Sequence, residues 1–380
     1  SGLPPHAGFL PMLAPSHGGD PELQAASHEG VLDENDVVDE GLQQLRLDPE
    51  LLALEEEYNA IASAVPLEAA KAAARAAEGG QGRESAHPVG DEDGAASAGG
   101  NLQELLRAAG GMGSVYGEMG WWAMVCIFDS IARHGGLPAG PGDFVDIGAG
   151  SGKALAAAGL LGQRATATNE AAGPTESWAR LRGIESSRPV HSASLAVASA
   201  WAAAGRLPAL ELMLGDATDY SLEGATLVLA HSTAFGDELM EAIAQAAEEA
   251  MQPGAWVVTL TRPLPRAAAR GWDLVEARRR TVSWGAATVF LHRRRAPGVA
   301  PRCTLYGASG EVAAPPDGAG QFRSQAWFNC RSCGLLGASG LCSPCAAVCH
   351  AGCAGVEFAA HSPFFCDCAG GQRGCCLAAQ

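Results

Sequence analysis

The feature that most constrains this fold is a short apolar run that ends in an acid and then in glycines at alternate positions. Residues 143–153 read Asp-Phe-Val-Asp-Ile-Gly-Ala-Gly-Ser-Gly-Lys. The apolar part predicts a buried parallel strand, and residues 154–161 predict the helix packed on it, so the glycines form a strand-to-helix turn. Glycine there lets the backbone approach a ligand closely, while free N–H groups at the helix start point into the crevice. Such a turn predicts either a nucleotide-type site or simply a tight connection.

Acids are expected at the ends of the neighbouring strands. Residues 165–169 are interpreted as the second strand, which places Glu170 at its tip, and residues 210–214 as the third, which places Asp216 just beyond it. The first acid can accept hydrogen bonds from ribose hydroxyls, and the second can meet an adenine amino group. Together with Asp146 they favour S-adenosylmethionine over a dinucleotide, because nothing in the pattern calls for a pyrophosphate. Each acid taken alone is equally typical of a solvated loop.

The acidity of the chain belongs to its N-terminal part. The 380 residues carry a net charge of −17, of which residues 1–114 hold −15, so the rest is nearly neutral. With 47% apolar residues there is material for real cores in two or three domains. No apolar run approaches the ~20 residues that span a bilayer, and no signal peptide is recognised, so we expect an intracellular protein of the nucleus or cytoplasm.

Residues 1–100 are predicted to be an acidic, low-complexity and partly helical region. Residues 79–100 form a Gly/Ala/Ser/acid linker with few large apolar side chains to bury. Residues 45–77 favour a helix or helical hairpin, either packed on the next domain or bound to a partner. The acid run at residues 33–40 is typical of a solvated segment, with docking of a basic partner as the alternative.

A polar loop precedes the glycine turn. Residues 114–118 read Ser-Val-Tyr-Gly-Glu, after a short helix expected at residues 102–106 and before a buried one at 121–132. Such a loop can fold over a cofactor, with Glu118 accepting hydrogen bonds from an amino group; an ordinary turn between helices is the alternative. Further along, the pattern predicts a helix at 238–251, the fifth strand at 255–261 and the last strand at 288–292.

Taken together, these motifs resemble the disruptor-of-telomeric-silencing family, the histone lysine methyltransferases that lack a SET domain. The resemblance covers about residues 112–295 and rests on the order and spacing of its pieces. They are Tyr116-Gly-Glu118, Phe144 to Gly152, Glu170, Gly215-Asp216, Ala234-Phe235-Gly236 and Val282-Ser-Trp-Gly285. The resemblance implies an α/β fold, the Rossmann-like seven-stranded class I S-adenosylmethionine-dependent methyltransferase, as a domain at residues 101–296.

The resemblance also implies a role for each matching position. The cofactor-binding residues would be Tyr116, Gly117, Glu118, Asp146, Gly148, Gly150, Gly152, Lys153, Glu170, Asp216 and Ala217. The catalytic, substrate-side residues would be Tyr116, His231, Ser232, Phe235 and Trp284, of which the two aromatic rings Phe235 and Trp284 would wall a narrow channel for a substrate nitrogen. Such a channel suits the chemistry, because burial lowers a lysine pKa and only a neutral amine attacks. Alignment of the amine and the methyl group would then carry most of the catalysis.

The departures from the family fall on the substrate side. Where the family has an Asn pair this chain has His231-Ser232-Thr233, and Val289 takes the place of a tyrosine in the last strand. The acceptor stays open between a histone and another basic protein, and His231 is either a proton acceptor or a histidine satisfied at a strand end. Basic clusters at residues 278–280 and 292–295 are typical of solvated strand ends, with a grip on phosphate or on an acidic patch as the alternative. Nucleic-acid contact is expected to be weak.

The cysteines are concentrated in the C-terminal tail, where 11 of the 12 lie between Cys303 and Cys376. Their spacing gives Cys330-x2-Cys333, Cys342-x2-Cys345, His350-x2-Cys353 and Cys366-x-Cys368. In an intracellular chain this spacing predicts zinc, a disulfide-linked secreted module being the alternative. The segment has little apolar core, and structural zinc contributes about 10–16 kcal/mol, so the metal is expected to fold it.

The order of these ligands resembles a UBR-type zinc finger at residues 303–380, in a domain that we begin at residue 297. Such domains occur in ubiquitin-pathway proteins that recognise N-terminal degradation signals. The resemblance implies one site from Cys330, Cys333, His350 and Cys353, and a two-zinc cluster from Cys303, Cys342, Cys345, Cys366, Cys368, Cys375 and Cys376, with Cys349 unassigned. A buried cation needs charged partners, yet residues 334–341 contain no acid and Asp367 is the one acid next to the final Cys-x-Cys pair, so we expect a protein-binding module without a commitment to basic N-terminal residues.

Two classes of function follow. The first is an enzyme, an S-adenosylmethionine-dependent protein lysine N-methyltransferase whose zinc module, with two or three Zn²⁺ ions, recruits substrate. The second is a catalytically weak methyltransferase-like protein that acts as a zinc-dependent binding module in ubiquitin-linked, N-degron recognition. The departures at residues 231–233 and at Val289 favour the second, whereas the loop at 116–118 and the strand-end acids favour the first.

Overall fold

The computed structural model describes residues 40–66, 68–72, 117–166, 178–305, 324–370 and 375–377. Tyr116, the linker at residues 79–100 and, apart from Glu40, the acid run at 33–40 lie outside this part of the chain. From Gly41 onward the described residues belong to one unit. Among the helices in these ranges, none combines the length and the apolar character that crossing a membrane requires.

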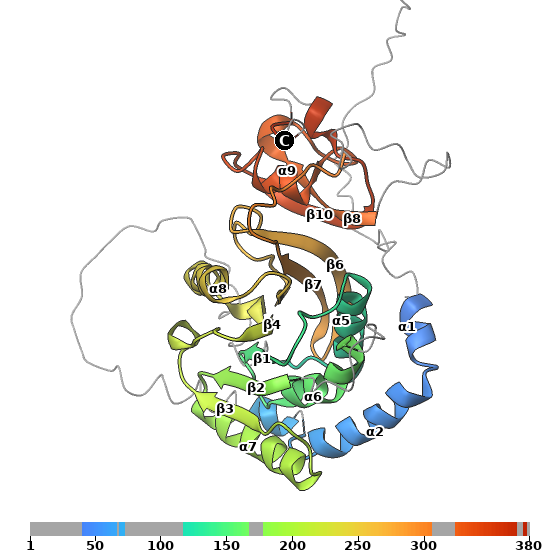
Figure 1. Ribbon diagram of the computed structural model, residues 1–380, viewed down its shortest axis with the longest axis vertical. Coiled ribbons are helices and arrows are strands. Elements are labelled where there is room, and N and C mark those ends of the chain that lie inside the picture. The colour runs from blue at the N-terminus through green and yellow to red at the C-terminus, as the bar shows by residue number, and fades with distance from the viewer. Residues whose placement is uncertain are drawn as a thin grey trace, which may run out of the picture. The chain divides into compact units, whose positions relative to one another are not determined.

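A seven-stranded sheet forms the centre of this unit (Figure 1). Its strands are β1 (Gly142–Ile147), β2 (Trp178–Glu185), β3 (Leu210–Leu214), β4 (Ala225–Ala230), β5 (Trp256–Leu260), β6 (Trp272–Val282) and β7 (Gly285–Arg294). They lie in the order β3-β2-β1-β4-β5-β7-β6, with β1 to β5 parallel and β7 antiparallel to both β5 and β6. This order with one reversed strand is the Rossmann-like fold of class I S-adenosylmethionine-dependent methyltransferases, so the predicted fold class is confirmed.

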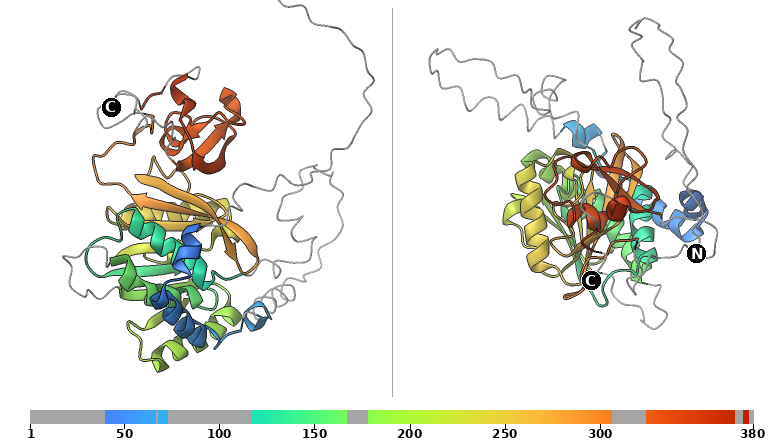
Figure 2. Two further views of the ribbon diagram at one scale, coloured as in Figure 1. Left: turned by 90° about the vertical axis from the view of Figure 1, so that its right-hand side faces the viewer. Right: turned by 90° about the horizontal axis from the view of Figure 1, so that it is seen from above.

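Helices cover both faces of the sheet (Figure 2). Phe144 of β1 packs on one face with α5 (Trp121–Arg133), α6 (Lys153–Thr166) and α7 (Arg188–Ala203). Val145 and Ile147 pack on the other face with α8 (Asp237–Ala250). All six residues of β1 are buried. Because β1 is parallel to its neighbours β2 and β4, its carboxyl end lies on the side of the sheet where ligands bind in open α/β folds.

The second strand is not where the sequence pattern placed it. Helix α6 extends to Thr166, and the next strand along the chain, which pairs with β1, is β2. The arginines of this strand do not fit the apolar pattern expected of a buried strand. The side chain of Arg182 is nevertheless only 8% exposed, because it pairs with Asp143 of β1 at 2.9 Å. The prediction of a strand at residues 165–169 is therefore wrong, and Glu170, which lies outside the described residues, does not end β2.

Most other predicted elements are confirmed. The helices expected at residues 121–132 and 238–251 are α5 and α8, and the strands expected at 210–214 and 255–261 are β3 and β5. The last strand, expected at 288–292, is the longer β7. The helix expected at residues 102–106 lies outside the described residues.

Two N-terminal helices precede this domain, α1 (Glu40–Leu45) and α2 (Pro49–Ala62). Helix α2 begins at a proline and is capped by Asp48, whose side chain accepts from two backbone N–H groups of the first turn. One face, which includes Tyr58, packs on α6 and α7, and Glu57 forms an ion pair with Arg206. The packed-helix alternative is confirmed for this part of residues 45–77.

The C-terminal residues form a small sheet around cysteines. Strands β8 (Ser324–Cys330), β9 (Leu341–Cys342) and β10 (Val356–Pro363) are antiparallel in the order β10-β8-β9, and α9 (Ser343–Ala347) follows β9. Six of the eleven residues in the buried core of this module are cysteines. The module contacts β6 and β7, where Phe358 meets Phe290 edge-on at 5.2 Å between ring centroids and the Ala277 N–H donates to His361 Nδ1 at 3.1 Å.

Candidate functional site

The glycine turn lies at the carboxyl end of β1. Gly148, Gly150 and Gly152 have φ angles of 78°, 54° and 81°, a left-handed backbone that favours glycine. A Cβ on Gly148 would lie 3.3 Å from the ring of Phe235 and 3.6 Å from Cβ of His231. The structure thus brings the turn together with the segment that follows β4, as a cofactor crevice requires.

Asp146, the acid of the apolar run, is completely buried next to this turn. Neither of its carboxylate oxygens accepts a hydrogen bond from the described residues. Within those residues its ion-pair partner is His231, whose Nε2 lies 3.2 Å from Asp146 Oδ1. Buried carboxylates are normally satisfied by donors. Asp146 therefore has capacity for a ligand that carries N–H or O–H donors or positive charge.

Glu185 ends β2 and faces the same turn. Its Oε2 accepts from the Gly150 N–H at 3.0 Å, and its Oε1 accepts from the Ser187 N–H at 2.7 Å. It occupies the strand-end position that was expected of Glu170. The signal in the sequence was an acid after the run 178–184, which the arginines of that run concealed.

Asp216 lies beyond β3, as expected, and is held by its own short turn. Its Oδ1 accepts from the N–H and the hydroxyl of Thr218, both at 2.8 Å, at the start of the 3-10 helix η3 (Ala217–Asp219). The backbone hydrogen bond, and then the side-chain one, lowers the pKa of Asp216. Ala217 packs on the α8 face of the sheet. The carboxylate is thus held ionised at the exposed edge of β3.

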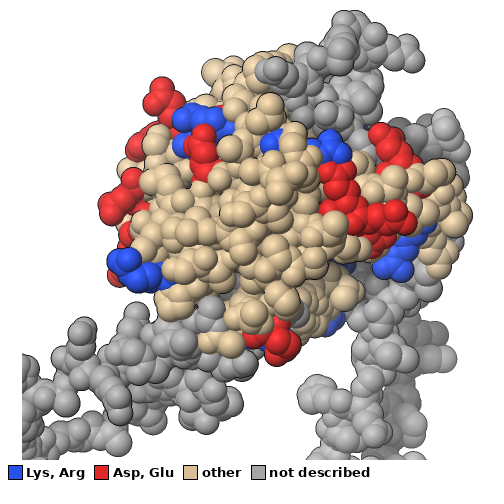
Figure 3. All heavy atoms as spheres, turned by 90° about the horizontal axis from the view of Figure 1, so that it is seen from below, with Lys and Arg blue, Asp and Glu red and all other residues tan. Residues whose placement is uncertain are grey.

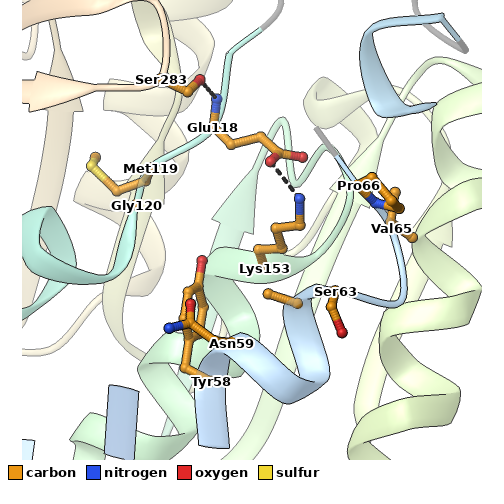
Figure 4. A pocket seen from close by; sticks show the side chains of 11 residues that line it. Tyr58, Asn59, Ser63, Val65, Pro66, Glu118, Met119, Gly120, Lys153 and Ser283 are labelled. Atoms are coloured by element: carbon orange, nitrogen blue, oxygen red, sulfur yellow. Dashed lines mark hydrogen bonds and ion pairs between the residues drawn. The ribbon is translucent and has the colours of Figure 1, made fainter. Parts of the chain in front are cut away.

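A cavity of about 360 Å³ opens between α2, the loop at residues 117–120 and the start of α6 (Figure 4). Glu118 and Lys153 line it as an ion pair of 2.7 Å, and the Ser151 hydroxyl also donates to the Glu118 carboxylate. The Glu118 N–H donates to Ser283 Oγ at 2.7 Å, which ties the loop to the turn between β6 and β7. The predicted cofactor loop is therefore joined to the helix that follows the glycine turn.

Trp284 and the N-terminal helix hold this loop from other directions. Gly117 lies against the ring of Trp284 so closely that a Cβ would be 1.7 Å from Cε3. Tyr58 of α2 lines the cavity, and burial, followed by the charge of Glu118, raises the pKa of its hydroxyl. Sequence reasoning missed Tyr58 as a wall of this cavity. The sequence signal for Tyr58 was the apolar spacing of its helix. That spacing indicates that the side chain is buried, but it does not indicate which part of the domain the side chain packs against.

Two substrate-side positions of the prediction lie inside the core. Ser232, on the 3-10 helix η4 (Ser232–Ala234), is completely buried, donates to the Leu260 carbonyl at 2.6 Å and accepts from the Leu260 N–H at 2.9 Å. Its hydroxyl therefore fastens η4 to β5. Val289 of β7 is also buried, in the core cluster that it shares with residues of α5 and α6. Phe235 and Trp284, in contrast, reach the glycine turn and the loop.

His231 follows β4 and lies among three acids. Burial alone lowers its pKa, but the carboxylates of Asp146, Glu185 and Glu118 outweigh burial and raise the pKa above its usual value. Its side chain is 13% exposed. His231 is thus a titratable group inside the crevice, at the end of β4 and paired with Asp146, and both of its alternatives, the proton acceptor and the satisfied histidine, stay open.

Three groups of Cys and His side chains in the C-terminal module are close enough to hold metal ions. They are Cys330, Cys333, His350 and Cys353; Cys303, Cys342, Cys345 and Cys366; and Cys345, Cys349, Cys368 and Cys375. Within each group, the candidate ligand atoms all lie within 4.8 Å of one another. Cys345 belongs to two groups, so one thiolate would bridge two ions.

The structure differs from the predicted ligand set at two cysteines. Cys349, left unassigned, belongs to the third group, four residues after Cys345 at the end of α9. Cys376, expected as a ligand, is exposed and stands outside the three groups, with its Sγ 2.8 Å from that of Cys349. Cys349 lies in the turn that follows α9, where the His350 N–H donates to the Cys345 carbonyl at 3.0 Å, and this turn keeps Cys349 near Cys345.

The two arginine clusters are used within the fold. Arg293 and Arg294 lie over the rings of Trp256 and Trp272, and Arg278 and Arg280 face the buried Glu276. Burial lowers the pKa of His292, between them in the sequence, to about 4. On the described part of the face in Figure 3, Lys and Arg lie in small groups next to Asp and Glu. These contacts favour the structural alternative over a grip on phosphate.

The fold and its crevice define a Rossmann-like domain of the methyltransferase type joined to a Cys/His-rich module. No family model matches the chain. A stretch of 54 residues, 14% of the chain, is 50% identical to the "Auxin transport protein BIG" of Oryza sativa subsp. japonica, and the match spans 1% of that protein's length.

Solved structures give only distant likenesses. TrmN from Thermus thermophilus is 21% identical, with 47% of this chain and 50% of that one covered and a TM-score of 0.34. Magnesium protoporphyrin IX methyltransferase from Synechocystis PCC 6803 is 13% identical, with 53% and 86% covered and a TM-score of 0.32. At these identities and TM-scores, neither likeness identifies a function for this chain.

Proposed function

We propose that the chain is an S-adenosylmethionine-dependent protein methyltransferase that acts on lysine of a histone or another basic protein. The observation that carries the proposal is Asp146, a fully buried carboxylate beside a left-handed glycine turn, whose one ion-pair partner among the described residues is His231 at 3.2 Å. A buried charge needs partners. The positive charge and the N–H and O–H donors of such a cofactor would supply them.

The other crevice residues suit the remaining parts of the cofactor. Glu185 would accept from the ribose hydroxyls and Asp216 from the adenine amino group, while Glu118 and Lys153 have the charges that an amino-acid end requires. S-adenosylmethionine, when bound, supplies an activated methyl group. The chain's own part is to exclude water and to align a neutral amine, because alignment carries most of the barrier reduction.

Aromatic side chains support an amine substrate. Phe235 packs by Gly148 and Trp284 by Gly117, so rings border the crevice at the turn and at the loop. An apolar surrounding lowers the pKa of a lysine amine and so raises the fraction that is neutral and nucleophilic.

We further propose that the three Cys/His groups bind zinc and form a UBR-type module that recruits protein. Thiolates and imidazole in sets of four are the ligands of tetrahedral structural zinc. Because cysteines make up more than half of the buried core, the metal would contribute on the order of 10–16 kcal/mol to folding. Asp367 already accepts from the Gly340 N–H at 2.8 Å, so recognition of a basic N-terminal residue is not part of the proposal.

A second function has one observation in its favour. Ser232 and Val289, which stand at the family's substrate-side positions, are core residues here. A protein that binds the cofactor, turns over weakly and serves as a zinc-dependent recognition module, including for degrons, would show this pattern.

Calorimetry with S-adenosylmethionine tests the shared basis of both functions. The wild type should bind, and Asp146→Asn should lose about tenfold or more in affinity, because it removes the charge that faces the ligand. Asp129→Asn, on the outer side of α5 where Asp129 pairs with Arg133, is the matched control. Absence of binding at millimolar ligand would refute both functions.

Two further measurements separate the functions. Radiolabelled cofactor, incubated with histones and with lysate, should label a lysine if the chain is an enzyme. Tight cofactor binding without any labelled acceptor would favour the recognition module. Elemental analysis should find three zinc ions per chain, and a metal-free folded module would refute the zinc sites.

A further inference from the structure

The crevice at the end of β1 collects more negative than positive side chains. Asp146 comes from β1, Glu185 from β2 and Glu118 from the loop, and Lys153 neutralises Glu118 at 2.7 Å. Glu185 is held by backbone N–H groups at 2.7 and 3.0 Å. Asp146 lacks such donors within the described residues, and His231 is its ion-pair partner.

His231 is fixed at this point by the chain around it. Its N–H donates to the Ile147 carbonyl at 3.1 Å, and the next residue, Ser232, is fastened to β5. The Nε2 to Oδ1 distance of 3.2 Å joins it to a carboxylate that has no contact with solvent. An unpaired charge in that position is unfavourable. An imidazolium at His231 therefore suits the ligand-free crevice.

We propose that His231 carries a proton that balances Asp146 while the crevice is free of ligand, and that a cationic ligand entering the crevice expels this proton to solvent. The inference rests on the proposed function, since the ligand is the sulfonium cofactor. One N–H bond of the imidazolium breaks, the proton goes to water, and no other bond changes. His231 is thus a cofactor-site residue whose protonation competes with the ligand.

The sign of the effect follows from the charges that face His231. Asp146, Glu185 and Glu118 all raise its pKa against burial, so the ligand-free crevice favours the protonated imidazole more than water does. A ligand with positive charge nearby acts in the opposite direction and lowers that pKa. Linkage is reciprocal. The proton on His231 therefore lowers the affinity for the ligand by the same factor by which the ligand lowers the affinity of His231 for the proton. Affinity for the cofactor should therefore rise with pH and level off above the pKa of His231 in the free protein.

Calorimetry from about pH 5.5 to about pH 8.5 measures this linkage, because histidine titrates in that range. Repeating each titration in buffers of different ionisation enthalpy counts the protons released. For S-adenosylmethionine we expect release that approaches one proton at the acid end, and affinity that rises by up to about tenfold per pH unit. His231→Gln should remove both effects. His134→Gln should keep them, because His134 also faces a buried acid, Glu276 at 3.6 Å, but outside the crevice.

A second ligand tests the inference without any variant. S-adenosylhomocysteine lacks the sulfonium charge and should release fewer protons from the wild-type protein, so the test stands even if His231→Gln does not fold. Equal release by the two ligands, no release by S-adenosylmethionine, or an unchanged pH slope in His231→Gln would overturn the inference and leave the proposed function intact. No binding of either ligand at any pH would overturn both.

Discussion

The loop that carries Glu118 rests on an aromatic ring, and Gly117→Ala perturbs that contact. A Cβ at Gly117 would lie 1.7 Å from Cε3 of Trp284 and 2.5 Å from Cδ2 and Cζ3. At Gly120, three residues further along the same loop, a Cβ would have no described atom of another segment within 4 Å. Gly120→Ala is therefore a matched control, with the same change in backbone entropy and without the clash.

The size of the effect follows from these distances. An ordinary contact of a Cβ is 3.4–4 Å, so the ring or the loop must move by about 2 Å. The new atom meets the body of a rigid ring rather than a flexible end, and the loop is expected to yield. Overpacking of this kind costs ~1–3 kcal/mol. If that cost falls on the position of the loop that binds the cofactor, affinity for S-adenosylmethionine should drop about 5- to 150-fold, since ~1.4 kcal/mol is tenfold.

Calorimetry measures the affinity of each variant for the cofactor, and thermal unfolding measures its stability. We expect Gly117→Ala to weaken cofactor binding, and Gly120→Ala, at the N-cap of α5, to leave the affinity for the cofactor unchanged. Wild-type affinity in Gly117→Ala would show that the loop is not part of the cofactor site. Equal losses in the two variants would show that the ring contact is not the cause.

Three other predictions concern an acid, the metal cluster and pH. Glu185→Ala should weaken cofactor binding about tenfold or more by calorimetry, because two N–H groups lose their acceptor, whereas Glu211→Ala on the exposed side of β3 should not; equal affinities would contradict the ribose role. Cys345→Ser should remove two metal ions per chain and Cys333→Ser one, as counted by elemental analysis, and equal losses would argue against a bridging thiolate. Burial lowers the pKa of His292 and of His361 to about 4, below the usual value of about 6.5, so their contribution to stability is full above about pH 6.5 and is lost as the pH falls toward 4. Urea unfolding measured across this window should show that decline, and a flat profile would contradict it.

How much could be predicted from the sequence depends on whether the relevant neighbours are local. The glycine turn and β1 lie within eleven consecutive residues, where backbone sterics and apolar spacing already determine the structure. Strand β2 could not be predicted in this way, because the residue that stabilises it is distant in the sequence. Arg182 suits a buried strand only because Asp143 on the adjacent strand neutralises it, and that pairing is a property of the folded sheet. The acid at the end of the second strand was misplaced for the same reason, since its position follows from the strand.

The cysteines show the same limit at a finer scale. Pairs such as Cys330-x2-Cys333 are local, and the first four-ligand group could be predicted from spacing and resemblance. The choice between Cys349 and Cys376 could not, because it depends on the turn after α9, which keeps Cys349 near Cys345. Tyr58 is a further case: an apolar pattern marks it for burial, but its place in the cavity depends on residues about 60 positions away, at Glu118.

Electrostatics separates the ligand classes that a glycine turn alone leaves open. A dinucleotide or a nucleic acid brings phosphates, which need cations or free N–H groups. Here the crevice presents the carboxylates of Asp146, Glu185 and Glu118, while Lys153 is paired with Glu118 and His231 with Asp146. Arg293 and Arg294 belong to one of the two basic clusters of the sequence, and their guanidinium groups lie over the rings of Trp256 and Trp272 in the core. An acidic crevice suits a compact cation better than a phosphate ester, which agrees with the sulfonium nucleoside proposed as its ligand.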